Sequence, residues 1–131
     1  MSQENVEIVR GFVDAIDRRD WRDTGKSLAP DYEYDHSRSV GPQRGVYKRE
    51  QMQLFLDEVN GAWESVRYEV HDYVAAGEQV VVPFTSHVRG RDGIELQARA
   101  AWVFTIRGGA VARQCYYPSR QDALAAVGLS E

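Results

Sequence analysis

From residue 65 onward the chain changes from a helical period to a period of two, and this pattern constrains the fold more than any other feature. Four strand-length runs follow one another, and Gly-containing turns separate them. They read VRYEVHDYVAAG, EQVVVPFTSHVRG, IELQARAAWVFTIRGG and AVARQCYYP. Pro83 in the second run predicts an edge position or a bulge, because proline cannot donate to a sheet ladder. The second half of the chain is therefore predicted to be a sheet of antiparallel strands.

The first half of the chain is predicted to be mainly helical. Apolar residues recur at helical spacing over residues 3–19 and from Met52 to about Gly61, and a short helical turn is predicted at residues 21–28. One strand, residues 31–37, precedes a loop over residues 37–47, and a short C-terminal helix follows residue 119. Helices gathered before a run of strands predict an α+β fold, with helices on one face of a curved sheet.

Composition narrows the class of protein. The chain has 131 residues, of which 43% are hydrophobic and 27% charged, and this suits one soluble domain spanning residues 1–131. A net charge of −4 argues against nucleic-acid binding. No stretch approaches the ~20 apolar residues of a membrane span. Cys115 is the single cysteine, which excludes an internal disulfide and fits a reducing compartment. We therefore expect a cytoplasmic protein that binds neither nucleic acid nor membrane.

The segment DYEYDHS, residues 31–37, carries different side chains on its two faces. One face consists of Asp31, Glu33 and Asp35, and the other of Tyr32, Tyr34 and His36. We interpret the acidic face as solvated. The other face has two phenols and an imidazole where a plain core would have Val or Leu, and we interpret it as the wall of a site. The alternative is a packed core, with the histidine bonded to a backbone carbonyl at the strand end.

Several segments of the chain together resemble one family. They are SQENVEIVRGFVDAIDRRDW, LAPDYEYDHS, RGVYKREQMQLFLDEV, AAGEQVVV, WVFTIRGGAV and SRQDALAAVGL. In this order they are similar to the SnoaL-like branch of the nuclear-transport-factor-2-like superfamily, over essentially the whole chain. The resemblance implies a cone-shaped α+β barrel, in which a curved antiparallel sheet wraps around the N-terminal helices, and a homodimer formed through the convex face. Relatives include ketosteroid isomerase, polyketide cyclases, scytalone dehydratase and non-catalytic binding modules, so the fold does not decide the activity.

The resemblance also implies roles for single residues. His36 occupies the position of the general base of the steroid isomerases, and histidine suits this role because its ordinary pKa is about 6.5. The oxyanion-hole donors of those enzymes correspond to Phe12, which has no hydroxyl, and to Trp102, which keeps only an indole N–H. Steroid isomerisation by that mechanism is therefore not expected. The acid that epoxide hydrolases and cyclases carry on a late strand is missing too, because Cys115 lies near its position.

The side chains that remain predict an aromatic, sparingly polar pocket. The predicted catalytic residues are His36, Tyr32 and Tyr34, with the histidine as base or acid and the tyrosines orienting the substrate. The predicted substrate-binding residues are Phe12, Trp63, Trp102, Phe104, Arg113, Cys115 and Tyr117, of which Trp102 or Tyr117 would donate to a substrate oxygen. His87 is the one plausible second histidine of the pocket. A metal site formed by His36, His71 and His87 is not expected, because no two histidines have close ligand spacing. No cofactor is expected either.

Two functions of different classes follow. The first is binding of a small, largely apolar or aromatic molecule in the cone, with cofactor-independent proton transfer of the isomerase, dehydratase or cyclase kind. The second is a non-catalytic ligand-binding or dimerisation module. The missing donors favour the second function and the position of His36 favours the first, so the sequence leaves open whether the protein is an enzyme.

Overall fold

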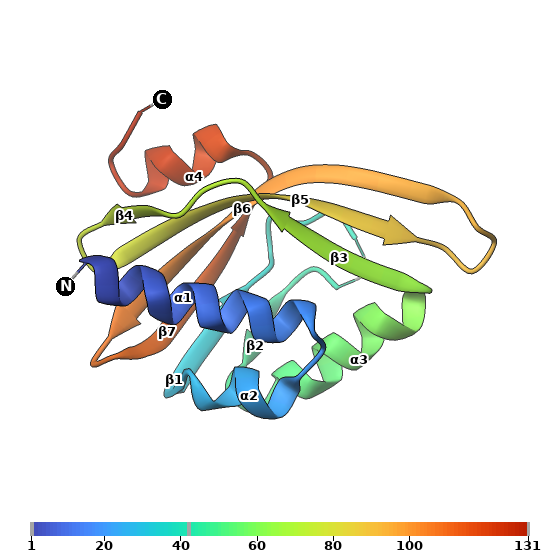
Figure 1. Ribbon diagram of the computed structural model, residues 1–131, viewed down its shortest axis with the longest axis horizontal. Coiled ribbons are helices and arrows are strands. Elements are labelled where there is room, and N and C mark those ends of the chain that lie inside the picture. The colour runs from blue at the N-terminus through green and yellow to red at the C-terminus, as the bar shows by residue number, and fades with distance from the viewer. Residues whose placement is uncertain (1, 42, 131) are drawn as a thin grey trace.

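The computed structural model describes residues 2–41 and 43–130 (Figure 1). In chain order the elements are α1 (Ser2–Asp17), α2 (Trp21–Lys26), β1 (Leu28–Asp35), β2 (Val46–Lys48), the 3₁₀ turn η1 (Arg49–Gln51), α3 (Met52–Ala62), β3 (Ser65–Val70), β4 (Val74–Ala76), β5 (Gln79–Arg89), β6 (Glu95–Arg107), β7 (Ala110–Tyr117) and α4 (Arg120–Ala126). The predicted helices and strands are present, but the first predicted run of the sheet forms two strands, β3 and β4. None of the described helices is long and apolar enough to span a membrane.

The strands form one curved sheet in the order β2-β1-β7-β6-β5-β3, and β4 also pairs with β5. The sheet does not close, since β2 and β3 lie at its two ends. Its pairs are antiparallel except for β1 and β7, which run parallel and place Tyr34 opposite Gln114. Most of the chain separates these two strands, so no tight hairpin dictates an antiparallel pairing. The predicted α+β cone is confirmed, with one parallel pair that the sequence did not indicate.

Two helices cover the concave face of the sheet (Figure 1). Helix α1 presents a buried stripe that includes Val6, Val9 and Phe12, because apolar residues recur on one side of the helix. This stripe joins the main hydrophobic cluster with inward-facing side chains of β5 and β6. Helix α3 contributes Met52 and Phe55 to the same cluster. The core therefore lies between the helices and the concave face.

Helix α4 packs on the convex face of the sheet. Ser119 caps this helix, since its side chain accepts a hydrogen bond from the backbone N–H of Asp122 at 3.1 Å, as their spacing predicts. The buried Ala123 and Leu124 lie in a second hydrophobic cluster, which also contains Cys115. The central strands consequently bury side chains on both faces.

Pro83 lies in an interior strand, so the predicted edge position is wrong. It stands opposite Ala101 in the continuous pairing of β5 with β6. On its other side the ladder is broken, because residues 71–73 separate β3 from β4. The backbone N–H of His71 donates to the carbonyl of Pro83 at 2.9 Å across this break. The nitrogen and carbonyl of one strand residue point to the same side, so the missing N–H of Pro83 faces the break.

Candidate functional site

A cavity of about 230 Å³ lies between the concave face of the sheet and helix α3. Its apolar lining includes Met52, Phe55, Leu56, Val59, Trp63, Phe84 and Trp102. Its polar lining consists of the side chains or backbone of Tyr34, His36, Ser39, Gln43, Tyr68, Ser86, Gln114 and Tyr116. In the described part of the chain, this lining contains no Asp, Glu, Lys or Arg. Such a lining suits a small, mostly apolar molecule that is oriented by a few hydrogen bonds.

His36 lies directly after β1, where the loop towards β2 begins. Its backbone N–H donates to the carbonyl of Gly45 at 2.7 Å, and its ring Nδ1 lies 3.0 Å from the carbonyl oxygen of Gln43. A carbonyl can only accept, so Nδ1 carries the proton of the neutral ring and Nε2 carries none. Among the described residues, Nε2 has no hydrogen-bond partner. Every fully buried side-chain nitrogen or oxygen in the described chain does have one, so Nε2 is not fully buried. The Nε2 lone pair is therefore accessible, on a ring that lines the cavity.

Three aromatic rings surround the imidazole of His36. The ring centroids of Tyr34, Phe55 and Tyr116 lie 5.1, 5.4 and 4.8 Å from its own. This burial lowers the pKa of His36 below its ordinary 6.5, although the carbonyl of Gln43 and the carboxylate of Asp35 favour the charged ring. At neutral pH the ring is therefore neutral, and Nε2 is a proton acceptor.

Tyr34 presents a hydroxyl beside His36. The indole Nε1–H of Trp102 donates to the Tyr34 hydroxyl oxygen at 3.1 Å. In the described residues the hydroxyl's own proton has no acceptor. Burial raises the pKa of Tyr34 well above 10, against the opposing effect of the Trp102 hydrogen bond. The group consequently stays protonated, and its hydrogen is available to an acceptor in the cavity.

Tyr32 lies behind the cavity lining instead of within it. Its side chain is fully buried, and its hydroxyl donates to the Gln114 Oε1 at 2.6 Å. Gln114 lines the cavity, opposite Tyr34 in the parallel register of β1 and β7. Tyr32 therefore holds the amide of Gln114 in place and does not itself reach a ligand.

Tyr68 and Tyr116 also line the cavity, although sequence analysis did not select them. Burial raises the pKa of Tyr68 to about 12 and also raises that of Tyr116, so both hydroxyls stay protonated at neutral pH. Tyr116 lies opposite Trp102 in the pairing of β6 with β7, which puts both side chains on the concave face. The adjacent Tyr116 and Tyr117 look alike in the sequence, so alternation could not decide which of them faces inward.

The predicted aromatic walls divide into two groups. Trp63 and Trp102 line the cavity as expected. Phe12 and Phe104 are fully buried and pack edge to face, with ring centroids 5.4 Å apart. They are not among the residues that line the cavity, and they belong to the core below it.

Arg113, Cys115 and Tyr117 lie on the convex face, so their predicted placement in the pocket is wrong. Cys115 belongs to the cluster under α4, and burial raises the pKa of its thiol. The Arg113 Nη2 lies 3.2 Å from the Asp35 Oδ2. The guanidinium of Arg38 lies 4.7 Å from the ring centroid of Tyr117. These groups form a polar network outside the cone and cannot contact a ligand within it.

The prediction of a solvated acidic face holds for Asp31 but is wrong for Asp35, which is buried. The Ser37 backbone N–H donates to the Asp35 Oδ1 at 3.0 Å, and the Arg38 Nη1 lies 3.4 Å from its Oδ2. Burial by itself raises the pKa of Asp35, but the hydrogen bonds from Ser37 and the charges of Arg38 and Arg113 outweigh it and leave the pKa lowered. The carboxylate is structural, because it ties β1 to β7.

The two other histidines are engaged elsewhere. The Nε2 of His87 lies 2.8 Å from the Glu69 Oε1, at an exposed position. The Nε2 of His71 lies 2.7 Å from the Thr85 Oγ1. His87 is not among the cavity's lining residues, so the expected second histidine does not join His36.

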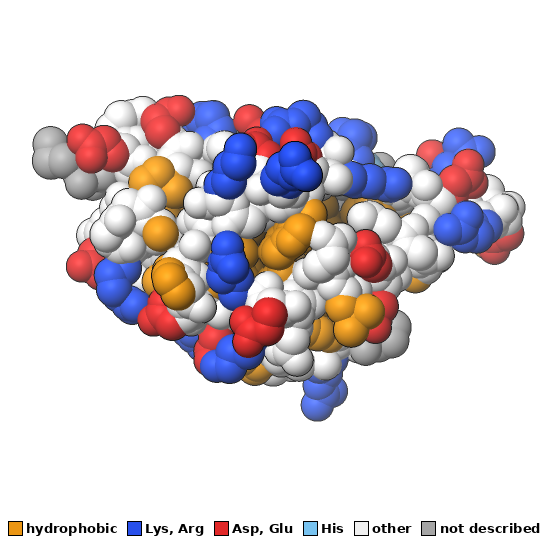
Figure 2. Space-filling view, turned by 90° about the horizontal axis from the view of Figure 1, so that it is seen from below, with side chains coloured by type: hydrophobic (Ala, Val, Ile, Leu, Met, Phe, Trp, Pro, Cys, Tyr) orange, Lys and Arg blue, Asp and Glu red, His pale blue; other side chains and the backbone are white. Residues whose placement is uncertain are grey.

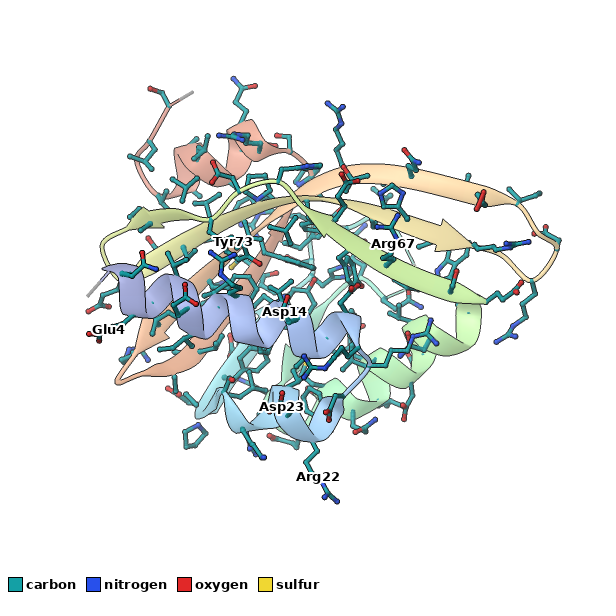
Figure 3. The ribbon with its side chains drawn as sticks, in the orientation of Figure 1. Glu4, Asp14, Arg22, Asp23, Arg67 and Tyr73 are labelled. Atoms are coloured by element: carbon teal, nitrogen blue, oxygen red, sulfur yellow. The ribbon has the colours of Figure 1, made fainter. Side chains whose placement is uncertain are left out.

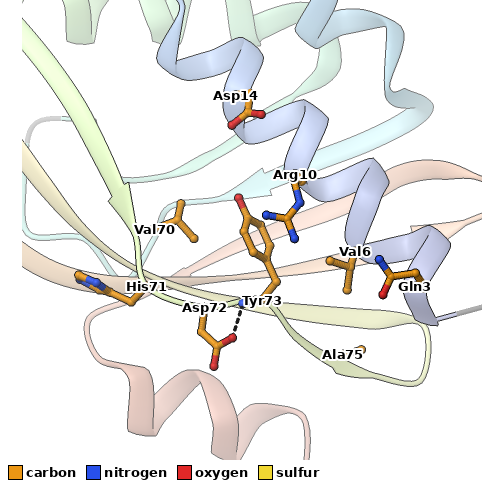
Figure 4. Close-up of a pocket in the computed structure, with 9 residues that line it drawn as sticks. All are labelled: Gln3, Val6, Arg10, Asp14, Val70, His71, Asp72, Tyr73 and Ala75. Carbon is orange, nitrogen blue, oxygen red and sulfur yellow. Dashed lines mark hydrogen bonds between the residues drawn. The ribbon is translucent and has the colours of Figure 1, made fainter.

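A wider surface hollow of about 690 Å³ lies between α1 and the segment that joins β3 to β4 (Figure 4). Tyr73 projects from this segment towards α1 (Figures 3 and 4), and the guanidinium of Arg10 lies 4.5 Å from its ring centroid. Asp72 accepts a hydrogen bond from the backbone N–H of Tyr73 at 2.8 Å. Since these polar groups contact one another, the inner cavity at His36 is the stronger candidate site.

Comparison with known families identifies this arrangement. The profile of the SnoaL-like domain matches residues 9–114, which include the second half of α1, the His36 loop and most of the sheet. The chain belongs to the SnoaL-like domain family. A comparison with curated proteins finds no match.

Solved structures share the fold of this SnoaL-like domain. TerC, co-crystallised with polyporic acid, is 20% identical, with a TM-score of 0.80 over 95% of this chain and 98% of that chain. A putative polyketide cyclase from Xanthomonas campestris pv. campestris is 22% identical, with a TM-score of 0.74 over 97% and 98%. A hypothetical protein from Catenulispora acidiphila with a ketosteroid isomerase-like fold, in complex with trimethylamine, is 21% identical, with a TM-score of 0.74 over 94% and 93%. These similarities establish the fold alone.

Proposed function

We propose that this SnoaL-like domain binds a small, largely apolar molecule carrying one oxygen acceptor or hydroxyl, in the cavity at His36. The observation that carries the proposal is the pair of unpartnered polar groups there: an accessible Nε2 lone pair on His36 and a Tyr34 hydroxyl proton without an acceptor in the described chain. One group accepts and the other donates. A phenol or a cyclic alcohol can bond to both groups, and a ketone can accept from the Tyr34 hydroxyl while His36 faces the carbon beside its carbonyl. The volume of about 230 Å³ favours a molecule of roughly one ring.

The chemistry that this pair supports is cofactor-independent proton transfer. His36 would take a proton from a carbon beside a substrate carbonyl and return it to the same or another carbon. Tyr34 would donate a hydrogen bond to the carbonyl oxygen as negative charge develops there. Trp102 assists through its hydrogen bond to Tyr34, and Tyr32 is a positioning residue for Gln114. Isomerase, dehydratase and cyclase reactions all contain such a step.

Two structural neighbours support ligand binding by this kind of domain, since they were crystallised with polyporic acid and with trimethylamine. The second candidate function, a binding module without turnover, is favoured by a different observation. The described lining has no carboxyl group, so no strong second acid or base accompanies His36. A homodimer in the cytoplasm remains part of the proposal for either function.

A thermal-shift screen with phenol, cyclohexanone and 4-methylcyclohexanol tests the binding claim. A ligand at a hundred times its Kd should add about 2.7 kcal/mol to the free energy of unfolding. The shift should shrink in His36→Asn, and Tyr34→Phe should weaken binding roughly two- to tenfold through one lost hydrogen bond. His87→Asn is the matched control, because it changes a histidine that does not line the cavity. Equal shifts in all three variants, or none in the unmodified protein, would refute the site.

Hydrogen–deuterium exchange separates catalysis from binding without knowledge of the natural substrate. Cyclohexanone in D₂O exchanges the protons beside its carbonyl, and NMR follows the loss of their signal. Exchange that the protein accelerates, that His36→Asn abolishes and that His87→Asn preserves would establish proton transfer at His36. Binding without accelerated exchange would favour the binding module.

A further inference from the structure

Gln114 carries a buried amide whose nitrogen has no partner in the described chain. The residue is 1% exposed, and its Oε1 accepts from the Tyr32 hydroxyl at 2.6 Å, but no hydrogen bond among the described residues involves its Nε2. Every fully buried side-chain nitrogen or oxygen in that part of the chain does have a partner, so Nε2 borders free space. Gln114 lines the cavity at His36. The NH₂ group of Gln114 therefore faces the candidate site.

Tyr32 determines which end of this amide faces the cavity. Its side chain is fully buried, and within the described chain its hydroxyl has no acceptor besides the Gln114 Oε1. If the amide were reversed, Nε2 would donate to the Tyr32 hydroxyl oxygen, and the hydroxyl proton would lose its acceptor. A buried donor without an acceptor is costly. Tyr32 consequently keeps Oε1 towards itself and Nε2 towards the cavity.

The amide lies beside the groups that bind the first ligand oxygen. Gln114 and Tyr34 stand opposite each other in the parallel pairing of β1 with β7, and both line the cavity. Adjacent strands are about 4.8 Å apart, and side chains on one face stand roughly perpendicular to the sheet. An oxygen held by Tyr34 and His36 therefore lies close to the Gln114 amide. A second oxygen can reach this amide from the neighbouring or the next-but-one ring carbon.

The charge of the lining restricts the kind of oxygen. Charged side chains of both signs are spread over the outer face that Figure 2 shows, whereas the described cavity lining has no Asp, Glu, Lys or Arg. A carboxylate or phosphate in the cavity would have no cation to pair with, and burying an unpaired charge is costly. The second oxygen is accordingly that of a neutral carbonyl, ether or hydroxyl group.

We infer that Gln114 determines ligand specificity, because its Nε2 donates to a second oxygen on the ring of a neutral ligand. This inference rests on the proposed function, in which His36 and Tyr34 hold the first oxygen. An amide N–H can only donate, whereas the phenol hydroxyls of the lining can donate or accept. A ligand with an apolar group in place of the second oxygen leaves the amide desolvated and without an acceptor, so the site binds it more weakly.

Two pairs of probes with matched shape test the inference. The 2- and 3-methoxyphenols carry the second oxygen, and the 2- and 3-ethylphenols replace it with a CH₂ group. Calorimetry gives each Kd for the unmodified protein and for the double variant Tyr32→Phe with Gln114→Met, which removes both partners of the inner hydrogen bond. In at least one pair, the Kd of the ethylphenol divided by that of the methoxyphenol should be about tenfold larger for the unmodified protein. Comparing the two proteins cancels the different hydration of the probes.

Gln97→Met is the matched control, because Gln97 is exposed on β6 and does not line the cavity. It should keep the Kd ratios of the unmodified protein. Tyr32→Phe alone should give intermediate ratios, since the released amide can also turn its Oε1 towards the cavity. Circular dichroism of each variant establishes that it is folded.

NMR of the unmodified protein supplies a measurement that needs no variant. With ¹⁵N-labelled glutamine, one side-chain NH₂ signal should move to lower field with a methoxyphenol and not with the corresponding ethylphenol. If the ethylphenols bind but the Kd ratios are unchanged in the double variant, or if no NH₂ signal distinguishes the probes, this inference is overturned and the proposed function stands. If none of the probes binds, both are overturned.

Discussion

His36 is held in a setting that disfavours its protonation. Three rings surround it, and burial lowers its pKa below 6.5. In the unfolded chain the ring has its ordinary pKa, so below about pH 6.5 the unfolded state binds more protons than the folded state. Stability from this group is therefore complete above about pH 6.5 and declines as the pH falls towards the lowered pKa of the folded state.

His36→Asn should remove this pH dependence. The free energy of unfolding, measured by urea denaturation between about pH 7.5 and pH 5, should fall less in the variant than in the unmodified protein, because Asn gains no charge. The difference between the two proteins should accordingly shrink or change sign as the pH falls. Curves that run parallel over this range would contradict a lowered pKa at His36.

At the residue scale, the sequence predicted inward-facing groups well where alternation was clear. Tyr32, Tyr34 and His36 share the concave side, as their spacing indicates. The prediction failed on β7, where Cys115 and Tyr117 face outward and Gln114 and Tyr116 face inward. On β7, polar and aromatic residues occur at both odd and even positions, so the alternation of residue types did not indicate which side chains point to the concave face. The pairing of β6 with β7 supplies that information, and it is a long-range property.

At the element scale, periodicity located the described α-helices and long strands, because those segments bury one consistent stripe or face. It missed β2, whose three residues are too few to show alternation. It also joined β3 to β4, because residues 71–73, which leave the ladder, contain no Gly or Pro that would mark a break between strands. The parallel pairing of β1 with β7 could not be predicted from periodicity either, because it depends on contacts between residues far apart in the sequence.

Replacing Gly11 and Gly77 by alanine should change the stability of the protein in opposite directions. A Cβ on Gly11 would meet nothing within 4 Å, and the residue lies inside α1, so Gly11→Ala should stabilise the protein by about 0.5–1 kcal/mol. Gly77 has a φ of 62° in the turn between β4 and β5, so Gly77→Ala should destabilise it by about 1 kcal/mol. Thermal denaturation of both variants measures the two shifts. Equal shifts of the same sign would contradict these backbone assignments.

At the scale of the whole molecule, the fold provides the cone-shaped cavity, and the side chains that line the cavity determine which molecules it can bind. The family match and the neighbours at TM-scores of 0.74–0.80 establish the architecture. In the described chain, the cavity then combines a neutral histidine, several phenols and the glutamines Gln43 and Gln114 in an uncharged lining. This combination supports recognition of one oxygen on an apolar molecule, and it is the central claim about this protein.

NMR of the histidine ring nitrogens tests this claim most directly, because the chain has three histidines and two of them serve as internal controls. With ¹⁵N-labelled histidine at about pH 7.5, His36 should show the tautomer protonated at Nδ1. Titration with phenol should shift the Nε2 signal of His36, which accepts the phenol proton, and leave His71 and His87 unchanged. A His36 ring protonated at Nε2, or a saturating titration that leaves its signals in place, would contradict the account.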